Sequence, residues 1–142
     1  MIEVIDQVRE MLSPLDNAMN LVAFSPTGSR FMCDPPVMNT DIDFVVLVVD
    51  HDAAAESLLA NGWTKCEGEN SDEENSSYDE LGEFSAYRKD NFNLIVCDDR
   101  AYYVKYCAAT LLCTQLNLLD KAERCALFQT VVKGESYVGR VA

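Results

Sequence analysis

The chain has 142 residues, of which 49% are hydrophobic, and a formal net charge of −13 at pH 7. This length is typical of one domain with its own core, and the acidic balance disfavours a broad surface for nucleic-acid phosphates. No run reaches the roughly 20 apolar residues of a membrane span, and residues 1–6 lack the basic start of a secretory signal. We therefore expect a single domain over residues 1–142, located in the cytoplasm and without a membrane partner.

Hydrophobic periodicity predicts a mixed α/β or α+β domain, with helices packed on a small sheet. Apolar residues three and four positions apart indicate helices, and short apolar runs indicate strands. The elements expected in chain order are a helix over 2–12, strands over 21–24 and 41–49, a helix over 52–61, strands over 63–66, 84–89 and 92–97, and two C-terminal helices within 99–134. The strand over 41–49 is apolar on both faces after its first residues, so we expect it to be central in its sheet.

Turn-forming residues predict where these elements begin and end. The first helix is expected to end near Ser13-Pro14, and Pro26 and Gly28 are expected to break the regular structure before a loop over 30–40. Asp90-Asn91 predicts a tight hairpin turn. The N-caps expected for the three later helices are Asp50 or Asp52, Asp98 or Asp99, and Asn117, with Gly134 ending the last helix.

The acidic residues are unevenly distributed. Residues 67–83, EGENSDEENSSYDELGE, carry eight carboxylates and no basic side chain. We interpret this segment as a solvated, mobile loop. The alternative is an acidic surface that mimics DNA, which requires ordered charge spacing.

The cysteines do not predict a metal site. The six of them form no C-x-x-C pair, and the chain has a single histidine. We expect reduced and mostly buried thiols rather than a zinc site or a disulfide framework.

Two aspartates open the central strand in the stretch TGSRFMCDPPVMNTDIDF, residues 27–44. Side chains alternate along a strand, so Asp41 and Asp43 are expected on one face, about 6.6 to 6.8 Å apart along the backbone. Two carboxylates this close repel each other, and a divalent cation relieves the repulsion. Mg²⁺ binds one or two carboxylates together with substrate phosphates, and a pair of such ions suits in-line transfer at phosphorus.

The same stretch offers groups that suit phosphate. Gly28 allows the backbone to approach a phosphate closely, and Ser29 adds a hydroxyl and an amide donor. Arg30 could contribute positive charge. The sequence therefore predicts a phosphate site and a metal pair on adjacent strands.

These residues resemble a known pattern. The order F-S-P-T-G-S followed by T-D-I-D-F resembles the minimal nucleotidyltransferase superfamily, in which Gly-Ser follows an apolar strand and Asp-x-Asp opens the next. The stretches GSRFMCDPPVMNTDIDF, NLIVCDD and LNLLDKAERCALFQTVV also resemble a group of bacteriophage proteins labelled nucleotidyltransferases, from about residue 20 onward. The resemblance implies a nucleotidyltransferase-like fold in the host cytoplasm. It implies transfer of a nucleotidyl group from an NTP to an acceptor with Mg²⁺ or Mn²⁺.

The resemblance also implies roles for individual residues. Asp41 and Asp43 would be catalytic and would hold the metal, while Gly28 and Ser29 would hold the β- and γ-phosphates. Active members of the fold carry a third carboxylate on a later strand, and Asn93 is the matching residue here. An amide cannot take a proton at neutral pH and is a weaker, neutral oxygen ligand. Carboxylates that could substitute are Asp98 or Asp99 at the strand end, and Asp34 in the loop.

Other functions stay open at this point. A catalytically degenerate member of the fold would bind a host protein or a nucleotide without transferring anything. An antitoxin-like enzyme would nucleotidylate a toxin partner, and an acidic DNA mimic would compete with DNA. In a purely structural interpretation, Asp41 and Asp43 point to solvent, and Asn93 is a polar residue beside a hairpin on an exposed strand face.

The later helices offer one more arrangement of interest. Tyr102, Tyr103 and Tyr106 could lie with Lys105 over a nucleotide, although a tyrosine-rich helix face is more often packing. The remaining basic residues are interpreted as surface charges, namely Arg88 and Lys89 near the acidic segment and Lys121 and Arg124 on the last helix.

Overall fold

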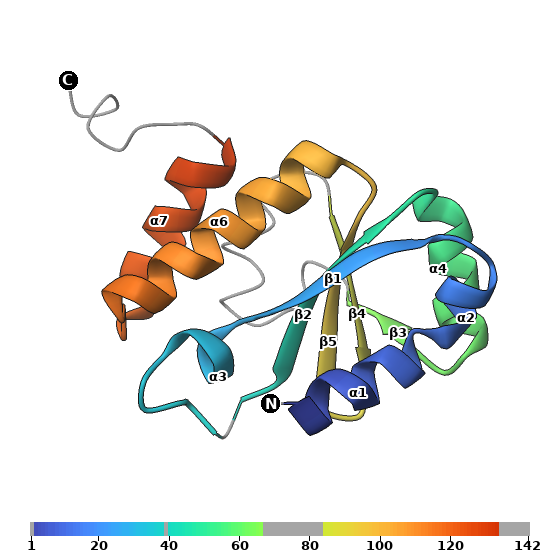
Figure 1. Ribbon diagram of the computed structural model, residues 1–142, viewed down its shortest axis with the longest axis horizontal. Helices are drawn as coiled ribbons and strands as arrows, with labels where there is room; N and C mark the ends of the chain where they lie inside the picture. Colours follow the sequence, from blue (N-terminus) through green and yellow to red (C-terminus); the bar gives the residue numbers. More distant parts are fainter. Residues whose placement is uncertain (1, 39, 67–83, 134–142) are drawn as a thin grey trace.

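A computed structural model describes residues 2–38, 40–66 and 84–133 of the chain (Figure 1). Six helices and five strands lie in these ranges. In chain order they are α1 (Ile2–Met11), α2 (Ser13–Asn17), β1 (Leu21–Thr27), α3 (Ser29–Met32), β2 (Ile42–Val48), α4 (His51–Ala60), β3 (Thr64–Lys65), β4 (Ser85–Lys89), β5 (Phe92–Cys97), α6 (Arg100–Leu116) and α7 (Lys121–Lys133).

The five strands form one mixed sheet in the order β1-β2-β5-β4-β3. The pair β2–β5 is parallel, and the other three pairs are antiparallel. The domain is therefore a mixed α+β fold, as the sequence predicts. β2 has a neighbouring strand on each side, which agrees with its expected central position.

Helices cover both faces of this sheet. Figure 1 shows α6 and α7 on one face, and α1, α2 and α4 on the other. Phe44, Val46 and Val48 pack into the core on the α1, α2 and α4 side, whereas Val45 and Leu47 pack on the α6 and α7 side. All five side chains are at most 4% exposed. This two-sided burial explains why β2 is an unbroken apolar run from Phe44 to Val48.

Two predictions for the first half of the chain are wrong. β1 continues to Thr27, past the expected break, and Pro26 pairs with Phe44 of β2. β1 is an edge strand, where a proline without an N–H is tolerated. The first helix, α1, does end near Ser13-Pro14 as expected, at Met11, but a further short helix, α2, begins at Ser13, where a proline in the first turn loses no helical hydrogen bond. The expected loop over 30–40 begins inside α3.

One prediction for the second half is also wrong. Asn117 does not start the last helix, because it is the C-cap of α6 with left-handed backbone angles, φ 48° and ψ 55°. The residue that caps α7 is Asp120, whose side chain accepts a hydrogen bond from the Ala122 N–H at 2.8 Å. Asn tolerates the left-handed conformation, as Gly does. An Asn between two helices is therefore suited to end the first helix as well as to start the second.

Other predictions for boundaries are confirmed. Asp50 caps α4 and Asp99 caps α6 through their carboxylates. Asp90, in the turn between β4 and β5, has a positive φ of 54°. The acidic segment 67–83, with the DNA-mimic hypothesis that depends on it, and Gly134 lie outside the described residues. Within the described ranges, we find no helix of the length and apolarity that crossing a membrane requires.

Candidate functional site

Four polar side chains form a row across one end of the sheet. Thr27 pairs with Asp43, Asp43 with Asn93, and Asn93 with Arg88. Directly paired residues of neighbouring strands point to the same face. The row therefore crosses β1, β2, β5 and β4 on the side of α6, where β1 ends and where β2 and β5 begin. We call these four residues the polar row.

Gly28 brings the Gly-Ser stretch against Asp43. It follows β1 with φ 80° and ψ 171°, a combination that is essentially restricted to glycine. A Cβ atom at this position would lie 2.0 Å from Oδ2 of Asp43 and 2.8 Å from its Cγ. The backbone can approach the carboxylate only because residue 28 has no side chain. The structure thus places Gly28 of the Gly-Ser pair against Asp43 of the Asp-x-Asp pair.

Ser29 and Arg30 stabilise the loop that joins the two motifs. The Ser29 side chain is buried, and its hydroxyl lies 3.3 Å from the Thr40 hydroxyl. Nη2 of Arg30 donates to the carbonyl oxygens of Met38 and of Thr40, the latter at 2.8 Å. These side chains therefore link the start of α3 to the residues just before β2, next to Asp43.

Asp41 has a partner that the sequence analysis missed. Its Oδ2 lies 2.6 Å from Nη2 of Arg88, and the two side chains are 32% and 41% exposed, respectively. The sequence alone indicates only a surface charge at Arg88, near the acidic segment. The predicted hairpin is the sequence signal that could have revealed the position of Arg88. A two-residue turn at Asp90-Asn91 fixes the register of β4 on β5, and this register places Arg88 opposite Asn93.

Asn93 is buried and faces Asp43. Its side chain is 3% exposed, and its Nδ2 donates a hydrogen bond to Oδ1 of Asp43 at 3.1 Å. The interpretation of Asn93 as a residue on an exposed strand face is therefore wrong. Its Oδ1 is buried without a hydrogen-bond partner, so this amide oxygen keeps both lone pairs available.

None of the suggested replacement carboxylates lies in the polar row. Asp98 and Asp99 follow the far end of β5, about 16 Å along the strand from Asn93. The Asp99 carboxylate accepts hydrogen bonds from the backbone N–H groups of the first turn of α6. Asp34 is exposed, and its backbone N–H and carbonyl both bond to the Asn117 side chain. The side chain that faces Asp43 from β5 is thus the Asn93 amide.

The donor set at the row suits one hard cation. Asp43 and Asp41 supply carboxylate oxygens, and the Oδ1 atom of Asn93 is a neutral oxygen without a hydrogen-bond partner. Mg²⁺ accepts such oxygens and completes its octahedron with phosphates and water. In the described residues, no group of three or more His, Cys, Asp and Glu side chains is placed to hold a metal. Two carboxylates and one neutral amide oxygen are therefore the oxygen donors that these residues would offer to a cation.

The tyrosines of α6 are packing residues, as expected. Tyr102, Tyr103 and Tyr106 are at most 9% exposed and belong to the core below α6, while Lys105 is exposed. The Tyr103 hydroxyl lies 2.7 Å from the Ser25 hydroxyl of β1. Burial raises the pKa of Tyr103 to about 12, so its hydroxyl stays protonated at neutral pH.

A hydroxyl pair fixes α6 over the polar row itself. The Thr27 and Thr110 hydroxyls lie 2.9 Å apart, and both residues are buried. Thr110 in turn donates to the Tyr106 carbonyl, within α6. The row is thus covered by α6 at its Thr27 end.

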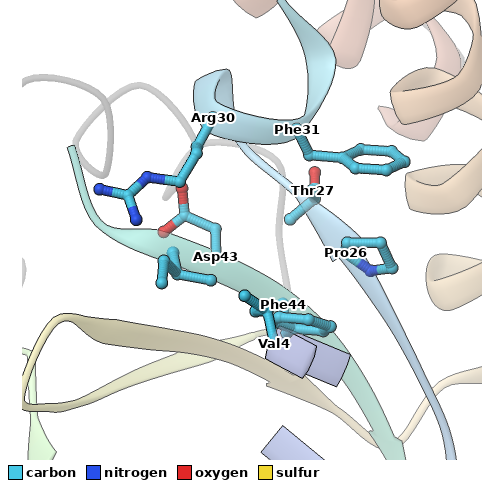
Figure 2. Close-up of a pocket in the computed structure, with 8 residues that line it drawn as sticks. Val4, Pro26, Thr27, Arg30, Phe31, Asp43 and Phe44 are labelled. Atoms are coloured by element: carbon cyan, nitrogen blue, oxygen red, sulfur yellow. The ribbon is translucent and has the colours of Figure 1, made fainter. Parts of the chain in front are cut away.

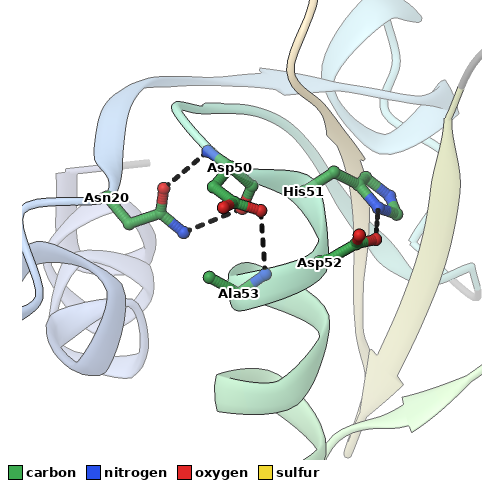
Figure 3. A network of polar contacts seen from close by, with 5 residues as sticks. All are labelled: Asn20, Asp50, His51, Asp52 and Ala53. Atoms are coloured by element: carbon green, nitrogen blue, oxygen red, sulfur yellow. Dashed lines mark hydrogen bonds and ion pairs between the residues drawn. The ribbon is translucent and has the colours of Figure 1, made fainter.

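A second polar cluster lies at the opposite end of β2 (Figure 3). Oδ1 of Asn20 accepts from the Asp50 N–H at 2.8 Å, and its Nδ2 donates to the Asp50 carbonyl at 3.1 Å. Oδ1 of Asp50 accepts from the Ala53 N–H at 3.1 Å. Nδ1 of His51 lies 3.9 Å from the fully exposed Asp52. These contacts connect β1 to the start of α4, so we assign the cluster a structural role.

Comparisons with protein-family models, with curated proteins and with solved structures gave no match for this chain.

Proposed function

We propose that this chain is a nucleotidyltransferase-like domain that binds an NTP with one Mg²⁺ or Mn²⁺ and transfers the nucleotidyl group to an acceptor. The observation that carries the proposal is the contact between Gly28 and the Asp43 carboxylate. A phosphate can approach the backbone of a glycine closely. A carboxylate binds a cation, and an NTP–magnesium complex presents a phosphate and a cation side by side.

Each residue of the site then has a role. Asp43 and Asp41 hold the cation, with the Asn93 amide oxygen as a neutral third ligand. The backbone at Gly28 and Ser29 contacts the β- and γ-phosphates, and the cationic side chain of Arg30 favours their negative charge. Bound Mg²⁺ supplies charge neutralisation and polarises the phosphoryl oxygens. Arg88 reduces the net negative charge of the site before the nucleotide binds, because its guanidinium pairs with the Asp41 carboxylate.

The transfer step exchanges one phosphorus–oxygen bond for another. An acceptor oxygen attacks the α-phosphorus, the bond from that phosphorus to the bridging oxygen breaks, and pyrophosphate leaves with the electron pair. The proton of a hydroxyl acceptor passes to water, since Asn93 cannot take it. Phosphoryl transfer depends mainly on positioning and electrostatics, so the residues of the row contribute chiefly by orienting the triphosphate.

The test compares Asp43→Asn with Asp52→Asn, a matched change at a fully exposed carboxylate of α4. Mg²⁺-dependent ATP binding by isothermal titration and pyrophosphate release in an acceptor screen are measured for both variants. We expect Asp43→Asn to weaken binding at least about tenfold and to abolish release, and Asp52→Asn to behave as wild type. Wild-type protein that shows no Mg²⁺-dependent NTP binding would overturn the proposal.

A second function is favoured by one observation. The third position of the row is an amide that already donates to Asp43, and Asp41 already has a cationic partner. This arrangement suits a degenerate nucleotidyltransferase that binds a nucleotide, a host protein or a toxin without transfer. Such a protein binds Mg²⁺·ATP but releases no pyrophosphate with any acceptor. Deletion of residues 67–83 in such a protein abolishes binding of the protein partner. Changing both Asp41 and Asp43 to Ala leaves this binding intact.

A further inference from the structure

The outer side of α6 carries an apolar stripe that is largely open to solvent. Its residues recur three and four positions apart, which places them on one side of a helix. They are Val104, Ala108, Leu111, Leu112 and Leu116. Val104, Leu111 and Leu116 are each at least 58% exposed, and Leu112 is 38% exposed. We call these five residues the α6 stripe.

The helix α6 is therefore apolar on both of its sides. On the side that faces the sheet, Tyr106, Ala109 and Cys113 are at most 1% exposed. By contrast, α1 shows the usual pattern of a surface helix, because Glu3 and Glu10 are exposed on its outer side. A helix that is apolar all round is normally buried all round. The composition of α6 thus fits a helix whose outer side is covered by another molecule.

The α6 stripe has the size and shape for a protein partner. It runs about 18 Å along the helix axis, from Val104 to Leu116, and contiguous apolar surface of this kind marks interaction sites. In comparison, the apolar pocket beside Asp43, lined in part by Val4 and Phe31 (Figure 2), has room for only about one water molecule. The outer side of a helix is convex, so the stripe suits a second helix laid along it.

The charges at the two ends of α6 match those of a second copy that runs in the opposite direction. Asp98 and Arg100 lie at the start of α6, and Asp120 and Lys121 follow its end. In an antiparallel pair, Arg100 meets Asp120 of the second copy, and Lys121 meets Asp98 of the second copy, so opposite charges are paired at both ends. A parallel pair would bring identical charges together. Between its ends, α6 carries no acidic residue that would oppose the contact.

The side chains in the middle of the stripe fit the same arrangement. Ala108 and Leu111 are one helical turn apart. With a two-fold axis between them, Ala108 of each copy faces Leu111 of the other copy. A small side chain thus meets a large one, which allows the two helices to approach closely and to interdigitate. The same axis leaves Asp98 and Lys121 equally far along the chain on either side, in agreement with the pairing of their charges.

We propose that the α6 stripe is the interface of a homodimer, in which α6 packs antiparallel against α6 of a second copy of this chain. The dimer is weak, with a dissociation constant of about 1–100 µM, because a single helix pair is smaller than a standard interface. The inference goes beyond the proposed function and does not depend on it, since neither Gly28 nor any residue of the polar row belongs to the stripe.

Sedimentation velocity of the full chain in a reducing buffer, from about 1 to 300 µM, tests the interface. Wild type should shift from the mass of one chain, 15.9 kDa, towards twice that mass as the concentration rises. Leu111→Glu places a carboxylate at the centre of the contact in both copies and should weaken dimerisation at least about tenfold. Leu59→Glu is the matched control, because Leu59 is 52% exposed on α4, outside the stripe, and this variant should dimerise as wild type does.

Carbodiimide crosslinking tests the direction of the two helices. This reagent joins a lysine to a carboxylate in contact with it, and Lys121 and Asp98 of one chain are separated by the whole length of α6. We expect a crosslinked peptide that contains both residues in the dimer band and not in the monomer band, as identified by mass spectrometry. A dimer band without a crosslink between the two ends of α6 would overturn the antiparallel arrangement.

Three outcomes of the sedimentation experiment would overturn the interface itself. Wild type that stays monomeric over this range would leave the stripe to a different protein. Folded Leu111→Glu that dimerises as wild type does would place the dimer contact elsewhere, and so would Leu59→Glu that fails to dimerise. Val104→Glu, at the other end of the stripe, takes the place of Leu111→Glu if the circular dichroism spectrum shows that Leu111→Glu is unfolded.

Discussion

The side-chain amide of Asn93 donates a hydrogen bond to the Asp43 carboxylate, with Nδ2 and Oδ1 3.1 Å apart and Asn93 almost fully buried. The two residues lie on the parallel strands β5 and β2 and are 50 positions apart in the chain. This bond gives the Asp43 carboxylate a neutral partner. It sets the first expectation below.

Asn93→Asp should convert the amide–carboxylate pair into two facing carboxylates. Without metal we expect the free energy of unfolding at pH 7 to fall by about 1–3 kcal/mol, because a hydrogen bond is replaced by repulsion between buried charges. Added Mg²⁺ should restore more stability to this variant than to wild type, as measured by urea unfolding in EDTA and in Mg²⁺. Asn91→Asp, in the exposed turn, is the control and should change stability by less than about 0.5 kcal/mol. Equal Mg²⁺ effects on the two variants would argue against a cation at Asp43.

Gly28→Ala should be more destabilising than Gly62→Ala, although both glycines have a positive φ. At Gly62 the nearest atoms to a new Cβ belong to the flexible Lys89 side chain, at 3.6 Å, so only the backbone penalty of about 1–2 kcal/mol applies. At Gly28 the new Cβ also collides with Asp43, which adds about 1–3 kcal/mol. Urea unfolding of the two variants measures the difference. Equal losses would contradict the close contact between residues 28 and 43.

Arg124→Met should destabilise the fold strongly, because Arg124 is not the surface residue that its helix position suggests. It is 4% exposed, and its Nη1 donates to the Leu118 and Leu119 carbonyls at 3.0 and 2.8 Å. Two carbonyls lose their donor in the variant, so we expect a loss of about 2–4 kcal/mol in the free energy of unfolding. The exposed Arg100 is the control, and Arg100→Met should cost less than about 0.5 kcal/mol. Similar losses in both variants would show that the buried contacts of Arg124 contribute little.

Stability should fall as the pH rises above 9, because buried thiols resist ionisation. Burial is the main cause that raises the pKa of Cys97 to about 12 and that of Cys113 to about 11. The unfolded chain releases these protons near pH 9, whereas the folded chain keeps them. Each thiol therefore stabilises the fold fully below pH 9, and this contribution is lost as the pH rises through the folded pKa, by up to about 1.4 kcal/mol per pH unit.

The measurement is urea unfolding between pH 7 and pH 10.5 in a reducing buffer. Cys97→Ala should flatten the decline above pH 9, although it lowers stability at every pH through the lost packing. Cys66→Ala, at a cysteine that is only partly buried, should keep the slope of wild type. An unchanged slope in Cys97→Ala would refute the buried-thiol explanation.

The sequence by itself determined most elements and their order. The apolar run of β2, the aspartate caps of α4 and α6 and the Asp90-Asn91 turn are local signals, because periodicity, capping and turn chemistry act within a few residues. The juxtaposition of Gly28 with Asp43 was also predictable, since Gly-Ser and Asp-x-Asp flank a single connection between neighbouring strands.

The tertiary structure decided everything that depends on distant partners. Pro26 remains in β1 because that strand is at the sheet edge, and Arg124 is buried because the turn between α6 and α7 presents carbonyls to it. The pairing of Asp41 with Arg88 and the burial of Asn93 against Asp43 follow from the register of β5 between β2 and β4. Sequence periodicity shows which face a residue takes, whereas its partner across the sheet is fixed only when the strands align.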